Sequence, residues 1–498
     1  MSKEQKSAFE DYQQSLSTAE SETVTAFFTE YDHHNFLNKT DKILMRKDFE
    51  NALLLYRSLG VTLDEALNRL DVRHLGGFYA RPSLRWFPLD SAAKIYPFSM
   101  AHGHMAVFRL SAYLTQEVLP ELLQMALTFT IKRFPSFATT VKKGFFWHYL
   151  DTSKRRYSVE PEASIPCRPL IVARSGSQSF RVLYYQNRIS VEFFHVLTDG
   201  FGGTVFLKTL LAEYLRLLGV QTGGDSDTLD IDAEPSPHEF ANGFTMVPKT
   251  ESASGFMDKP AVQMSGRLSR QKPCRVLHFN MKADGLKQAA KQYNATITAY
   301  LLALIFVAVK SATDEAKGTV NIQVPVNMRK FYPTDTLRNF SMYCGIKLPL
   351  AEIADAQSIV NDIANQLTQR ASLEAMSEMV TSARRIVAAL RHIPLIVKTP
   401  AVKAVNGLLS DRVFSTTLSN LGVVALPREL NAHVLRMDAV MGPAVMNRAS
   451  CALITCRGTA TLSITKATAD PSFEEKLYAL LLSDGVTPSV EGSSLHEN

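Results

Sequence analysis

The chain has 498 residues, enough for two or three domains, and 46% of them are hydrophobic while 20% are charged. This composition excludes wholesale disorder, because so many apolar side chains can bury a large core. The 54 Lys and Arg residues exceed the 48 Asp and Glu residues by only six and are spread along the chain, so we expect no nucleic-acid partner.

The sequence predicts neither a secretory signal nor a transmembrane helix. The longest apolar run, residues 299–309, has eleven residues, whereas a transmembrane helix needs about 20, and the first 22 residues resemble no secretory signal. The cysteines are odd in number and form no CxxC pair, which favours free thiols in a reducing compartment, so we expect a cytoplasmic protein. They are Cys167, Cys274, Cys344, Cys451 and Cys456.

Residues 1–82 have a helical pattern and are predicted to form an N-terminal appendage packed on the main body. The leucines within 53–59 lead to Gly60, a residue that suits the end of a helix. Thr62 and Glu65 follow at the spacing of a capping box, which predicts the start of a second, shorter helix.

Residues 83–218 change to a mixed α/β pattern and are predicted to form a first subdomain. Gln186 and Asn187 separate two β-rich runs, as in a hairpin, and a glycine-rich stretch at 200–203 is expected to delay the helix that follows. The expected strands are 105–114, 180–185 and 188–195, and the expected helices are 115–133 and 204–218.

Residues 219–273 are rich in Gly, Pro, Ser and acidic residues and are predicted to form a crossover or linker. Their acidic spacing superficially suggests a calcium loop. The segment lacks the Gly and Glu that such a loop needs at its sixth and twelfth positions, so we expect no calcium site.

Residues 274–482 return to an α/β pattern of similar size and predict a second subdomain. Alternating apolar residues predict strands, and longer apolar stretches predict helices. The tail at 483–498 is small and polar, and we expect it to be disordered. The expected strands are 276–281, 319–326, 340–348, 414–418, 434–440, 451–456 and 459–465, and the expected helices are 284–310, most of 352–410 and one from 472.

The stretch from Phe194 to Gly203 carries the clearest chemical signal. Alternation along the preceding strand places His195 at the strand end, just before a glycine turn. Because the ordinary pKa of histidine lies near 6.5, an imidazole there suits general-base catalysis at neutral pH. Asp199 stands four residues later, where an ion pair with an arginine would fix the loop that presents the imidazole.

The HxxxDG spacing of His195, Asp199 and Gly200 resembles the active-site motif of the chloramphenicol acetyltransferase-like superfamily, which includes alcohol acetyltransferases and the condensation domains of peptide synthetases. The run Val324–Arg329 followed by Asn339 and Phe340 resembles a second conserved segment of these enzymes. Residues 418–422, with the sequence LSNLG, resemble a third segment. The resemblance covers residues 86–482 and is nearest to the alcohol acetyltransferase-like group.

The resemblance implies an α/β (α+β) fold of two subdomains with a tunnel between them. It further implies a transferase that moves an acyl group, acetyl in the simplest case, from acyl-CoA to an alcohol or amine. His195 would be the general base, and no covalent acyl-enzyme, bound cofactor or metal would be needed. Asp199 and Arg329 would form a structural pair. Thr417, Ser419 and Asn420 are candidates for contacts to the oxyanion or acyl group.

Phe194 stands where condensation domains usually have a second histidine, which favours the acetyltransferase side of the superfamily. Two alternatives stay open: an enzyme that takes its acyl group from a carrier protein, and a non-catalytic binding protein with the same fold. His102 and His104 have no companion ligand at a metal-binding spacing, and the sequence contains no P-loop, GxGxxG, HExxH or GxSxG motif.

Overall fold

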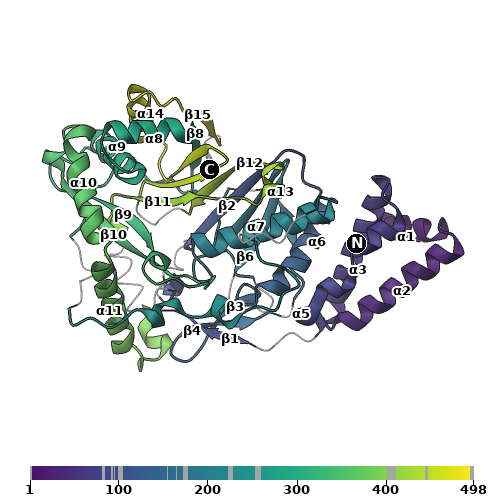
Figure 1. Cartoon of the computed structure of the whole chain (residues 1–498). Coiled ribbons are helices and arrows are strands. Elements are labelled where there is room, and N and C mark those ends of the chain that lie inside the picture. The colour runs from purple at the N-terminus through teal and green to yellow at the C-terminus, as the bar shows by residue number, and fades with distance from the viewer. Residues whose placement is uncertain are drawn as a thin grey trace.

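The computed structural model describes residues 3–80, 85–90, 93–94, 96–98, 105–153, 155–163, 165–171, 178–221, 228–252, 259–400, 411–442 and 447–493. The strands in this part of the chain form three sheets, of three, five and seven strands, and helices cover them (Figure 1). No single helix within it is long and apolar enough to cross a membrane.

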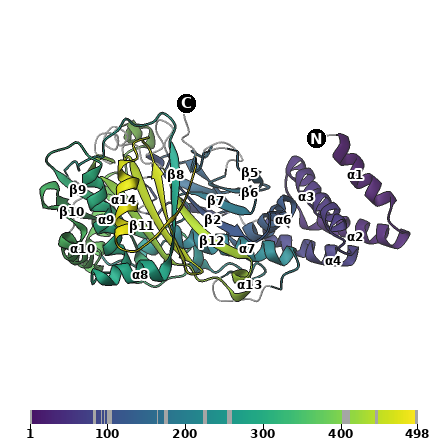
Figure 2. The same cartoon turned by 90° about the horizontal axis from the view of Figure 1, so that it is seen from above.

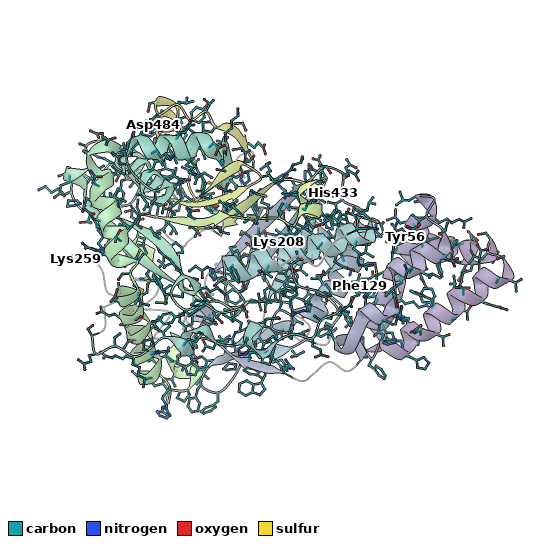
Figure 3. The ribbon with its side chains drawn as sticks, in the orientation of Figure 1. Tyr56, Phe129, Lys208, Lys259, His433 and Asp484 are labelled. Atoms are coloured by element: carbon teal, nitrogen blue, oxygen red, sulfur yellow. The ribbon has the colours of Figure 1, made fainter. Side chains whose placement is uncertain are left out.

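Helices at the N-terminus pack on one end of the main body, away from the seven-stranded sheet (Figures 1 and 2). Their bounds are α1 Lys3–Gln14, α2 Thr18–His34, α3 Lys39–Ser58, α4 Leu63–Arg69 and α5 Gly76–Ala80. Gly60 follows α3 with φ +74°, and the Thr62 side chain caps α4. The rings of Phe49 and Phe129 lie 6.1 Å apart, and the Tyr56 hydroxyl donates to the Leu217 carbonyl at 2.6 Å (Figure 3). These helices therefore share one apolar core with the first half of the main body.

The five-stranded sheet has the order β12-β2-β7-β6-β5 and is covered by α6 and α7. Its strands are β2 Val107–Leu114, β5 Val159–Pro161, β6 Phe180–Tyr185, β7 Arg188–Phe194 and β12 Val434–Met441, and the helices are α6 Pro120–Thr130 and α7 Gly200–Leu217. The prediction that the last helix starts at 204 is wrong, because α7 begins at Gly200 behind its cap, Asp199.

Strand β12 crosses from the second half of the chain into this sheet. It pairs antiparallel with β2, with Asp438 opposite Ser111. Residues 434–441 of the predicted second subdomain, 274–482, therefore lie in the sheet of the first half. The edge of β2 would otherwise expose unpaired backbone groups, and β12 satisfies them.

A smaller antiparallel sheet, β1-β4-β3, lies beside the first half. Its strands are β1 Trp86–Pro88, β3 Thr139–Lys143 and β4 His148–Thr152. Between the halves, residues 228–252 contain only short 3₁₀ helices, at Pro237–Phe240 and Gly243–Met246.

The seven-stranded sheet has the order β10-β9-β11-β13-β14-β8-β15. Its strands are β8 Arg275–Lys282, β9 Thr319–Asn327, β10 Ser341–Pro349, β11 Thr416–Val423, β13 Ala449–Cys456, β14 Thr459–Lys466 and β15 Ser489–Gly492. The helices of this half are α8 Ala283–Gln292, α9 Ile297–Ser311, α10 Ala356–Arg370, α11 Leu373–Ala389 and α14 Ser472–Ser483. The helix predicted at 284–310 is two helices, because Asn294 takes φ +51° and Thr296 caps α9.

The prediction of a disordered tail at 483–498 is wrong over its first part. Val486 is buried, and β15 pairs antiparallel with β8, with Val490 opposite Phe279. Strand β8 would otherwise be an edge of the sheet, so pairing with β15 satisfies its backbone groups.

Candidate active site

His195 follows directly after β7 and is half-buried. Its amide donates to the Ala106 carbonyl at 2.8 Å, which continues the pairing of β7 with the region before β2. The imidazole lies between two aromatic rings. Tyr96, from the short 3₁₀ helix Tyr96–Phe98, stacks on it at 5.1 Å and 20°, and Phe108 lies 5.0 Å away on the sheet.

Asn339 holds the polar side of the imidazole. Its Nδ2 lies 3.2 Å from the His195 carbonyl oxygen and 3.3 Å from Nδ1. Its Oδ1 accepts from the amide and hydroxyl of Ser341, at 3.2 and 3.0 Å, so Nδ2 faces His195. The ring also interacts with its own main chain, which favours its charged form.

Burial lowers the pKa of His195 below its ordinary value of 6.5, and the nearby charge of Asp199 acts in the opposite direction. The imidazole is therefore neutral at pH 7, which is the protonation state that a general base needs.

Asp199 makes no hydrogen bond to the imidazole; its carboxylate joins the two halves of the molecule. Oδ1 accepts from the Gly202 amide at 3.2 Å and caps α7. Oδ2 accepts from Arg329 Nη1 at 2.7 Å and from the Phe340 amide at 2.8 Å. Every oxygen of this buried carboxylate has a donor, so the loop after His195 is fixed to the second half.

Arg329 uses its remaining donors on the same segment. Nε and Nη2 donate to the Thr336 carbonyl at 3.1 and 2.7 Å, and Nη2 also donates to the Arg338 carbonyl at 2.8 Å. The guanidinium lies 4.4 Å from the centre of the Phe201 ring. The planar fork of an arginine matches this set of acceptors, and a lysine would not.

Close approach requires glycine at Gly202, in the first turn of α7. A Cβ at Gly202 would lie 2.1 Å from the Leu337 carbonyl oxygen and 2.3 Å from Thr198 Oγ1. One at Gly200 would lie 3.2 Å from Leu421. The first turn of α7 therefore sits directly against backbone and side chains of the second half.

The three residues on β11 that are candidates for contacts to the oxyanion or acyl group have different surroundings. Thr417 Oγ1 donates to the Gln323 side chain at 3.0 Å. Asn420 binds the Thr298 hydroxyl through Nδ2 at 3.0 Å and the Gly422 amide through Oδ1 at 2.9 Å. The Ser419 hydroxyl makes no side-chain hydrogen bond to the residues that the structure describes. The structure brings none of the three into hydrogen-bond contact with His195.

A second buried pair, Asp90 and Arg338, lies near this site. Arg338 Nη2 is 3.8 Å from Asp90 Oδ2 and donates to the Pro88 carbonyl at 2.6 Å. Burial raises the pKa of Asp90 to about 6, Arg338 opposes the rise, and the charge of Asp199 adds to it. The sequence analysis missed this pair.

Asn339 and Tyr96 are the other residues that sequence reasoning left without a role. Asn339 stands in the segment that carries the resemblance, but only the fold shows its amide beside His195. No local pattern marks Tyr96. His102 and His104 lie outside the described residues. Among those described, no group of three or more His, Cys, Asp and Glu side chains is placed to hold a metal ion.

One family model and several solved structures match this chain. The family model "Alcohol acetyltransferase" matches residues 239–370, a segment that contains Arg329 and Asn339 but not His195. No curated protein sequence matches the chain.

Several solved structures share the fold at low sequence identity. TRI101 of Fusarium sporotrichioides, complexed with coenzyme A and T-2, is 12% identical with a TM-score of 0.54, over 81% of this chain and 99% of that chain. TRI3 trichothecene 15-O-acetyltransferase from the same organism is 12% identical with a TM-score of 0.52, over 80% and 94%. The epimerization domain from the third module of tyrocidine synthetase B is 10% identical with a TM-score of 0.53, over 81% and 96%. The resemblance drawn from the motif is confirmed: the chain has the fold of the chloramphenicol acetyltransferase-like and condensation superfamily.

Proposed function

From a fold shared by acetyltransferases and condensation enzymes, we propose that the protein is an acyltransferase that moves an acyl group, acetyl in the simplest case, from acyl-CoA to an alcohol or amine. The observation that carries this proposal is the neutral imidazole of His195, which Tyr96 and Asn339 hold in place.

In the proposed reaction, Nε2 takes the proton of the acceptor O–H or N–H as the acceptor atom attacks the thioester carbonyl carbon. A tetrahedral oxyanion forms, and its collapse breaks the C–S bond. The departing thiolate receives the proton from the imidazolium, which returns His195 to its neutral form and releases free CoA. No acyl-enzyme and no bound cofactor take part. General-base assistance of this kind contributes about 10²–10⁴ in rate.

The oxyanion needs a hydrogen-bond donor, and Ser419 is the candidate on β11 that we propose. The side chains of Thr417 and Asn420 are engaged with Gln323 and Thr298, whereas the Ser419 hydroxyl has no such partner within the described part of the chain. Leu421, two residues later, contacts Gly200, so this part of β11 lies against the motif. Loss of such a donor costs about 10²–10³ in kcat.

The remaining residues act on His195 indirectly. Asn339 and Tyr96 position the ring, and the pair of Asp199 with Arg329 fixes the loop that follows it. We place acyl-CoA and the acceptor in a tunnel between the halves, where both reach His195. The five cysteines are buried free thiols, which suits the cytoplasmic location that we propose.

A carrier-protein-bound acyl group is the alternative donor. The fold shared with a peptide synthetase domain supports this alternative. Against it stands Phe194, at the position of the second histidine of condensation domains. The third hypothesis is a non-catalytic binding protein. The presence of all three residues, His195, Asp199 and Arg329, argues against it.

The test is release of free thiol from acetyl-CoA by the purified chain with a panel of alcohols and amines, beside His195→Ala. We expect acceptor-dependent thiol from the wild type and a loss of at least about 10²-fold in the variant, with unchanged circular dichroism. Wild-type activity in His195→Ala would refute the general base. A folded wild type that stays silent with acetyl-CoA but turns over a carrier-bound acyl group would support the alternative donor.

A further inference from the structure

Two segments far apart in the sequence expose large apolar side chains beside each other. In the β3–β4 loop, Phe145 is 72% exposed and Phe146 is 38% exposed. In the segment after α11, Ile396 is 83% exposed and Val397 is 62% exposed. The Leu395 amide donates to the Phe145 carbonyl at 2.8 Å, so the two segments lie side by side, and we call these four exposed side chains the apolar ridge.

Specific side-chain contacts hold the base of the apolar ridge in place. The Phe145 and Phe146 rings meet edge to face at 4.7 Å. Beneath them, Lys398 is buried with its ammonium 3.3 Å from the centre of the Trp147 ring, and it donates to the Leu390 carbonyl at 3.2 Å. The loop and the later segment are therefore fixed to each other from below while their apolar tips face solvent.

Aromatic side chains continue the ridge across the small sheet. Trp86 on β1 is 65% exposed, and its ring lies 6.3 Å from Tyr149 on β4. Tyr149 in turn lies against Gly144, at the start of the β3–β4 loop. Trp and Tyr with one apolar and one wet side are typical of side chains at a membrane–water interface.

The charge around the ridge is positive. Residues 134–150 and 379–400 contain no Asp or Glu. Lys143, Arg391 and His392 are exposed beside the ridge, and within the described chain none of them has an ion-pair partner. Lys142 is the exception, because it pairs with Asp151. Apolar tips accompanied by exposed cations complement a surface that is apolar inside and anionic outside.

We propose that the apolar ridge docks on an anionic lipid bilayer, with Phe145, Phe146, Ile396 and Val397 inserted among the acyl chains and Lys143 and Arg391 against lipid phosphates. The exposed Lys143 and Arg391, near the apolar tips in sequence, favour an anionic lipid surface over an uncharged apolar protein partner. This proposal goes beyond the proposed reaction and does not depend on it, since its test measures binding alone.

The ridge is also connected to the candidate active site. Lys94 lies 5.4 Å from the centre of the Trp147 ring, and Tyr96, two residues later, stacks on His195. One short segment thus contacts both the base of the ridge and the catalytic imidazole. An apolar acceptor that departs from the bilayer at the ridge would therefore enter the protein close to His195.

Co-sedimentation of the full-length protein with vesicles tests the proposal. The vesicles contain either phosphatidylcholine alone or phosphatidylcholine mixed with phosphatidylglycerol. We expect binding to the mixed vesicles that weakens as salt is added, because the cations contribute through screened attraction. The double variant Phe145→Ser/Ile396→Ser should bind at least about tenfold more weakly. Lys143→Glu/Arg391→Glu should lose the preference for the anionic vesicles.

Phe36→Ser is the matched control, because Phe36 is 65% exposed and lies in the link between α2 and α3, outside the apolar ridge. It should bind vesicles like the wild type, and all variants should keep the wild-type circular dichroism. Absence of vesicle binding, or equal binding by the ridge variant and the control, would overturn the proposal. A ridge variant that changes only the oligomeric mass would show instead that the ridge is a protein–protein interface.

Discussion

The carboxylate of Asp199 and the guanidinium of Arg329 meet at 2.7 Å, both buried, from opposite halves of the molecule. Asp199 stands four residues after His195 and at the N-terminus of α7, while Arg329 follows β9. The pair therefore connects the position of the loop after His195 to the packing of the second half.

Removal of one partner should destabilise the fold. Asp199→Ala leaves Arg329 as an unpaired buried charge and removes the cap of α7, so we expect a loss of about 3–5 kcal/mol in the free energy of unfolding, measured by urea denaturation. Asp151→Ala is the matched control: its pair with Lys142 is exposed, and its loss should cost at most about 1 kcal/mol. Equal losses in the two variants would contradict the connecting role of Asp199.

Gly202→Ala should damage the same junction by overpacking. The added Cβ would lie 2.1 Å from the Leu337 carbonyl oxygen, which belongs to backbone and cannot move aside easily. We expect a loss of about 1–3 kcal/mol in unfolding free energy together with a fall in kcat. Gly77→Ala, on α5 with open space around it, should leave both quantities nearly unchanged or raise stability slightly. A wild-type melting curve for Gly202→Ala would refute the close contact.

The pH profile of activity should report the state of His195. Because burial holds the pKa of the imidazole below 6.5, kcat/KM should rise with pH along a limb whose midpoint lies below 6.5 and then reach a plateau. Asn339→Asp places a negative charge beside the ring and favours the imidazolium, so the limb should move to higher pH. Asn339→Ala should lower kcat with little change in KM. A limb that stays in place in Asn339→Asp would remove Asn339 from its positioning role.

Local patterns predicted much of this architecture. The hairpin predicted at Gln186 and Asn187 joins β6 to β7, and Gln186 takes the left-handed φ of +50° that such a loop needs. The start of α7 was misplaced because glycines disfavour helices, whereas here Asp199 caps the helix and contact with Leu337 requires Gly202.

Other features are tertiary and leave no local signal. Strand β12 has the alternation of any half-buried strand, and nothing in its residues specifies β2 as the partner. Asn339 lies next to His195 only because Arg329, Phe340 and Asp199 bring the two segments together. The exposure of Phe145 and Ile396 likewise follows from the fold and not from their neighbours in sequence.

Asp90 should make stability depend on pH in a defined window. Its pKa is about 6 in the folded protein, above the ordinary value of 3.8, because the carboxyl is fully buried. Between these values the folded state holds more protons than the unfolded state, so the free energy of unfolding should fall as pH rises from about 4 to about 6. The contribution is at most about 3 kcal/mol at 1.36 kcal/mol per pKa unit. Asp90→Asn cannot ionise, so urea denaturation at a series of pH values should show a flatter profile and a higher stability relative to wild type above pH 6. A slope as steep as that of the wild type would mean that another group titrates in this window.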